Sequence, residues 1–107
     1  MFQKGSPAVA ARTITAENQF TNTITLDCGE ACTFSFILGS LAGTTINFQR
    51  TFDGGVTWRD MSNAAGTSNF TASIELQMVA AERCEVRAGC KTGGFGSGAG
   101  SVRIGKG

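Results

Sequence analysis

The run TFDGGVTW at residues 51–58 is the feature that most constrains the fold of this chain. Its pattern, Thr-x-Asp-x-Gly-x-x-Trp, is typical of a β-hairpin whose turn is tied by a side chain. Asp can hydrogen-bond the backbone two residues on, Gly supplies a positive φ, and Trp caps the returning strand. The run therefore predicts an all-β chain with a structural turn made by Thr51, Asp53, Gly55 and Trp58.

Apolar and polar residues alternate on both sides of this run. The pattern predicts strands at residues 21–28, 32–38, 44–52, 69–78 and 83–90, a return strand through Val56 and Trp58, a last strand around Val102 and Ile104, and an edge strand at 12–16. A period of two, with turns about every 8–12 residues, is typical of a small antiparallel β-sandwich, Ig-like or jelly-roll-like. Residues 79–82 are the one place where we expect a helical turn.

Parity along the predicted strands indicates the side chains of the core. They are Ile24, Leu26, Phe34, Phe36, Leu38, Ile46, Phe48, Phe52, Phe70, Ala72, Ile74, Leu76, Met78, Val86 and Ala88. Ile37 breaks the alternation, so we expect it on a second buried face or at an interface. Arg50 falls on the core side, where a buried charge needs a partner. We expect it to pair with Asp53 or Asp60, with a neighbouring subunit as the alternative.

The length of 107 residues indicates one domain with one modest core. Residues 1–11 show no period, and we interpret them as an extended N-terminal arm before a single β-sandwich domain at 12–107. No segment reaches the roughly 18 apolar residues of a membrane-spanning helix, and the N-terminus lacks the apolar stretch of a signal peptide. We therefore expect no membrane contact and synthesis in the cytoplasm.

The composition argues against catalysis and nucleic-acid binding. The chain has no His and no Tyr, and its eight acids are scattered, so it lacks the commonest general base, the commonest metal ligand and a paired carboxylate. A net charge of +1 is too balanced for phosphate neutralisation. The glycine-rich stretch at 93–100 lacks the Lys-Ser or Lys-Thr and the helix of a phosphate-binding loop, and we interpret it as a mobile hairpin loop. We expect no enzymatic activity, no cofactor and no metal ion.

The four cysteines, Cys28, Cys32, Cys84 and Cys90, admit three interpretations. Their spacings of four and six residues are poor for a zinc site, which prefers closer pairs. Disulfides are uncommon in proteins that mature in a reducing cytosol. Parity aligns Cys28 with Ile24 and Leu26, and Cys84 and Cys90 with Val86, so we favour reduced core thiols for most of them and keep one or two disulfides as the alternative.

Three blocks of the chain resemble a family of small tailed-bacteriophage virion proteins. Residues 45–60 resemble the family's hydrophobic-x-Leu-Gln-Arg-Ser-Phe-Asp-Gly-Gly-x-Thr-Trp core, residues 85–104 its final hairpin, and residues 34–44 its strand and loop ending in Gly-Thr. The chain departs from the family at Val86, where an aromatic residue often precedes the Arg, and in its four cysteines. The run at 51–58 also matches the Asp box of sialidase-like propellers. A propeller needs several blades of about 40 residues, and this chain has one copy of the motif.

The resemblance implies a structural protein of the virion, made in the host cytoplasm. Its expected role is head decoration: a cement protein that binds and stabilises the capsid lattice, with a tail or neck component as the variant. The implied partners are the major capsid protein or other virion proteins and further copies of the chain, with a trimer as one form. The alternative is a recognition module that presents the loops at 39–43, 62–68 and 93–100 to a receptor or carbohydrate. It ranks second because we expect Trp58 to be packed, which leaves Phe95 as the only loop aromatic.

Overall fold

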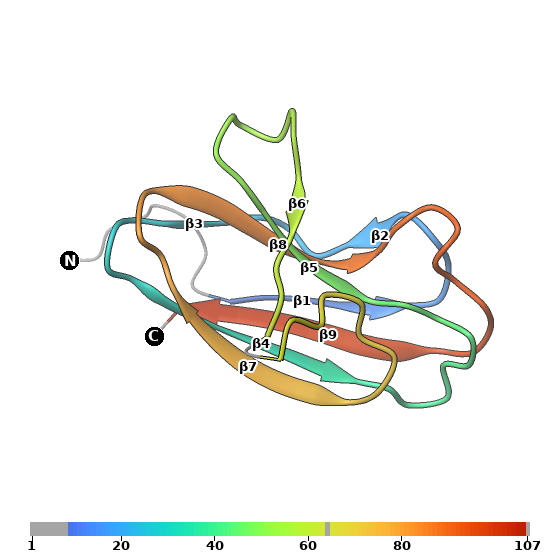
Figure 1. The fold of residues 1–107 in the computed structure, drawn as a ribbon. Coiled ribbons are helices and arrows are strands. Elements are labelled where there is room, and N and C mark those ends of the chain that lie inside the picture. Colours follow the sequence, from blue (N-terminus) through green and yellow to red (C-terminus); the bar gives the residue numbers. More distant parts are fainter. Residues whose placement is uncertain (1–8, 64, 107) are drawn as a thin grey trace.

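The computed structural model describes residues 9–63 and 65–106, which form two antiparallel β-sheets packed as a sandwich (Figure 1). The strands are β1 (Val9–Ile14), β2 (Gln19–Phe20), β3 (Ile24–Leu26), β4 (Ala31–Ile37), β5 (Asn47–Thr51), β6 (Arg59–Asp60), β7 (Ile74–Val79), β8 (Cys84–Cys90) and β9 (Gly100–Lys106). This confirms the predicted fold class. The described residues contain no helix, and the expected helical turn at 79–82 is wrong, because this segment bends directly from β7 into β8.

Each sheet has a simple order of neighbours. The first sheet runs β1-β9-β4-β7, and the second runs β2-β8-β5-β6. Strand β3 also pairs with β8. Strand β3 lies along residues 84–86 of β8, and β2 lies along residues 89–90. The two sheets form the two layers in Figure 1, and their inner faces enclose the core.

A pair of stacked phenylalanine rings joins the two sheets. Phe34 of β4 and Phe48 of β5 have ring centroids 5.0 Å apart and planes within 4° of parallel. Phe70 tilts against Phe34 with centroids 5.7 Å apart. The buried hydrophobic residues around these rings include Ile14, Ile24, Leu26, Phe36, Ile46, Val86, Val102 and Ile104. Most of the core predicted from parity is therefore confirmed.

Two side chains depart from that predicted core, and Ile37 departs from its expected burial on a second face. Phe52 is 47% exposed because β5 ends at Thr51 and the chain then leaves the sandwich. Ala72 is exposed because it precedes β7, which begins at Ile74. Ile37 lies at the end of β4 and is 61% exposed, so no second face among the described residues buries it. Its role at an interface stays a prediction.

The ends of several strands differ from the predicted ranges. Strand β1 begins at Val9 and not at residue 12, since residues 9–11 pair with 103–105 of β9. The last three residues of the predicted arm thus belong to the sheet, and residues 1–8 lie outside the described residues. The strand predicted after the Asp-Gly-Gly turn is β6, at residues 59–60.

The glycine-rich loop after β8 is anchored, contrary to our expectation of a mobile hairpin. Ala42 and Ser97 exchange two backbone hydrogen bonds of 3.0 Å, and the Thr45 N–H donates to the Gly94 carbonyl at 2.7 Å. A Cβ added at Gly96 would lie 2.1 Å from the carbonyl oxygen of Ala42. Glycine is needed here because two backbones approach closely.

The inter-sheet ring contact predicts a large effect of one substitution. Phe48→Ala should lower the free energy of unfolding by about 3–5 kcal/mol, because it removes a buried ring and leaves a cavity. Ile37→Ala is the matched control on the outer face and should change it by no more than about 0.5 kcal/mol. Urea unfolding of both variants measures the change in the free energy of unfolding. Equal losses of stability in the two variants would contradict the ring contact between the sheets.

Candidate interaction site

The β5–β6 hairpin (residues 47–60) leaves the body of the sandwich and projects from the second sheet (Figure 1). Only Gln49 with Asp60 and Arg50 with Arg59 pair between the two strands. Residues 52–57 form the tip, and Val56 there is 85% exposed. The run singled out in the sequence therefore forms an exposed projection.

The tip is held by the side chains of its first residues. The Thr51 hydroxyl donates to Asp53 Oδ1 at 2.7 Å and accepts the Gly55 N–H at 3.0 Å. Asp53 Oδ1 also accepts the Thr57 N–H at 2.9 Å, so the aspartate reaches four residues on and not two as we expected. Gly54 and Gly55 have φ of 74° and 97°, which side-chain-bearing residues rarely adopt.

These hydrogen bonds fix the charge of Asp53. Acceptance of the Thr57 N–H and of the Thr51 hydroxyl, in that order of importance, lowers the pKa of Asp53 to about 2. The carboxylate is therefore ionised at neutral pH. The hydrogen bonds to Asp53 Oδ1 that close the turn therefore also place a negative charge at the tip.

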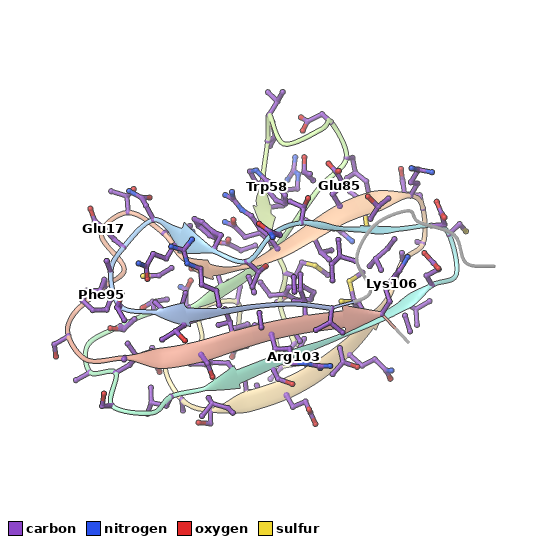
Figure 2. The ribbon with its side chains drawn as sticks, turned by 180° about the vertical axis from the view of Figure 1, so that it is seen from behind. Glu17, Trp58, Glu85, Phe95, Arg103 and Lys106 are labelled. Carbon is purple, nitrogen blue, oxygen red and sulfur yellow. The ribbon has the colours of Figure 1, made fainter. Side chains whose placement is uncertain are left out.

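A cation stacked between two aromatic rings connects the hairpin to its sheet. The Arg87 guanidinium lies 3.8 Å from the centre of the Phe20 ring and 4.1 Å from that of the Trp58 ring. Trp58 is half-buried at the base of the projection (Figure 2). A Cβ added at Gly55 would lie 3.7 Å from its ring, so the ring lies close to the turn.

Hydrogen bonds extend this stack into a polar network. Arg87 Nε donates to Gln49 Oε1 at 2.9 Å, Gln49 Nε2 donates to Asp60 Oδ1 at 2.9 Å, and Lys91 Nζ pairs with Asp60 Oδ2 at 2.7 Å. Partial burial lowers the pKa of the Arg87 guanidinium, which nevertheless stays charged. The network attaches β6 to β5 and β8 on the outer face of the second sheet.

Sequence reasoning missed Phe20, Arg87, Gln49 and Lys91. One signal was Gly89, a glycine within the predicted strand at 83–90, since such a residue often marks a close backbone approach. A Cβ at Gly89 would lie 2.0 Å from the Gln19 carbonyl oxygen. This contact lets β2 approach β8 and brings Phe20 over Arg87.

The expected ion pair of Arg50 is wrong. In the part of the chain that the structure describes, Arg50 pairs with neither Asp53 nor Asp60, and Asp60 binds Lys91 instead. The Arg50 guanidinium lies 4.9 Å from the centre of the Phe52 ring. Its Nε is buried without a hydrogen-bond partner in the described residues.

All four cysteines are free thiols, but they do not share one environment. Cys32, Cys84 and Cys90 are buried as predicted, and burial raises their pKa, that of Cys32 to about 11. Cys28 is exposed, contrary to prediction, because β3 ends at Leu26; its thiol donates to the Ala81 carbonyl at 3.2 Å. Among residues 9–63 and 65–106, no group of three His, Cys, Asp or Glu side chains could hold a metal ion.

Comparison with protein-family models, curated proteins and solved structures finds no match to this chain. The described part of the chain also contains no helix with the length and apolar composition that crossing a bilayer requires.

The turn hydrogen bonds predict how acid affects the hairpin. Because the pKa of Asp53 is about 2 in the folded chain against an ordinary 3.8, its stabilising contribution is complete above pH 4 and declines as pH falls through 2. NMR titration of the Asp53 carboxyl carbon should give the low pKa. Thr51→Val removes the hydroxyl donor and should move the pKa back toward the ordinary value. An unchanged pKa in that variant would contradict the role of Thr51.

Proposed function

We propose that this chain is a non-enzymatic structural protein of a bacteriophage virion that decorates the head by binding the capsid lattice. The resemblance of residues 45–60 and 85–104 to small virion proteins supports the proposal. A sandwich with one projecting hairpin is compatible with it, since the body supplies rigidity and the hairpin a contact. A tail or neck position would use the same contact with a different virion protein.

The exposed apolar tip of the β5–β6 hairpin is the observation that carries the proposal. Phe52 is 47% and Val56 85% exposed, although side-chain hydrogen bonds hold the backbone around them. Apolar side chains on a preorganised turn bind a partner at little entropic cost, because the turn is already ordered. We infer that the tip contacts another protein of the particle.

A receptor- or carbohydrate-recognition module is the second candidate. An open depression of ≈ 400 Å³ on the second sheet is lined by Asn18, Phe20, Arg87, Lys91 and Thr92. It combines a half-buried aromatic ring with amide, hydroxyl and cationic groups, which is the mixture that binds sugars. Because Arg87 is already engaged by two rings and Gln49, the particle role remains our first proposal.

The particle role is tested by purifying virions from the bacterial lysate in which the chain is made. The chain should co-sediment with particles through a density gradient, at a copy number comparable with that of the capsid protein. Absence from the particles, together with binding on a glycan array, would reject the structural role in favour of recognition.

A pair of variants tests the contact itself. Val56→Asp should weaken particle binding at least about tenfold while the melting temperature stays unchanged, because an exposed tip residue packs against nothing in the free chain. Val79→Asp is the matched control at the edge of the first sheet, where Val79 is 62% exposed, and should bind normally. Equal binding by both variants would exclude the hairpin tip as the contact.

A further inference from the structure

Two arginines lie directly opposite each other in the β5–β6 hairpin. Arg50 of β5 pairs with Arg59 of β6, so both side chains lie on the same side of the hairpin. Like charges in this arrangement destabilise a strand pair. Neither guanidinium forms a salt bridge or a hydrogen bond within residues 9–63 and 65–106. The hairpin thus holds two adjacent cations without a bound counter-charge.

One of these guanidinium groups also has an unused buried donor. Nε of Arg50 is buried and makes no hydrogen bond in the described part of the chain, while its guanidinium stacks on Phe52. A buried N–H without an acceptor costs free energy, and such groups in native proteins usually bind a water or an ion. The Phe52 ring offers no acceptor in its plane. Because Nε itself is enclosed, an acceptor from outside the chain meets Arg50 through the open pocket that this side chain lines.

The pocket beside the two arginines selects the charge of that acceptor. Arg50 and Arg59 line an open pocket of ≈ 230 Å³ together with Phe52, Asp53 and Thr57. Asp53 is ionised at neutral pH, so two positive charges and one negative charge leave a single positive charge. A ligand group with one negative charge neutralises the pocket. A phosphate group carries nearly two negative charges, which is more than this pocket neutralises.

We propose that this pocket binds a carboxylate, supplied by an Asp or Glu side chain of a partner protein. A guanidinium presents parallel N–H donors that match the two oxygens of a carboxylate. The exposed ring of Phe52 covers the methylene groups that carry the carboxylate in an acidic side chain. This site goes beyond the particle role, because any protein with a suitably placed acidic residue would fit it.

Sodium acetate is the simplest probe of the site. In an NMR titration at constant ionic strength, acetate should shift the Nε–H signals of Arg50 and Arg59 with a half-saturation on the order of 10 mM, since so small a ligand binds weakly. Sodium chloride at the same ionic strength should not. Inorganic phosphate, as a second probe, should bind no more tightly than acetate.

Substitutions at Arg59 separate binding from folding. Arg59→Gln should raise the half-saturation for acetate at least about fivefold. Arg103→Gln, at an arginine of the opposite sheet labelled in Figure 2, is the matched control and should leave it unchanged. Arg59→Glu places a carboxylate opposite Arg50 and should abolish acetate binding while raising the melting temperature by about 2–4 °C.

Four results would overturn the proposal. They are the absence of a saturable acetate shift at the two arginines, an equal response in Arg59→Gln and Arg103→Gln, phosphate binding tenfold tighter than acetate, and a lower melting temperature for Arg59→Glu. None of them depends on whether the chain is found in virions, so the two proposals can fail separately.

Discussion

The hydroxyl group of Thr51 connects the packed sheet to the hairpin that projects from it. Thr51 is 2% exposed at the end of β5, and its oxygen binds both the carboxylate of Asp53 and the backbone N–H of Gly55. Without these bonds, residues 52–57 would be an exposed loop with few tertiary contacts, which is the part of a protein that opens most easily. The positions of Asp53 and Gly55 at the tip depend on this connection.

The two sides of the hairpin have different environments. On the outer side, Trp58 stacks on Arg87, and Asp60 is neutralised by Lys91, so the polar groups have partners within the chain. On the other side, Arg50 and Arg59 form no salt bridge within the described residues, and Phe52 is exposed beside them. Electrostatic complementarity favours a partner at the side whose charges are unmet. The stacked side holds the hairpin in place, and the carboxylate site that we propose lies on the other side.

The sequence allowed the fold to be predicted further than the site. The period of two identified the β-sandwich and most of its core, because burial of one sheet face leaves that pattern in the chain. Parity failed at Phe52 and Cys28, where the strand had already ended. The Thr51–Asp53 turn was predictable because its bonds are local. The contact of Phe20 with Arg87 was not, because it joins residues far apart in the chain through the close approach permitted by Gly89.

Amide hydrogen exchange at the tip tests the central claim most directly. The N–H groups of Gly55 and Thr57 bind side-chain oxygens, whereas that of Val56 makes no hydrogen bond in the described residues. Relative to their intrinsic rates, Gly55 and Thr57 should exchange about tenfold or more slowly than Val56, as expected from one net hydrogen bond each. Equal protection at all three positions would contradict a tip held by Thr51 and Asp53.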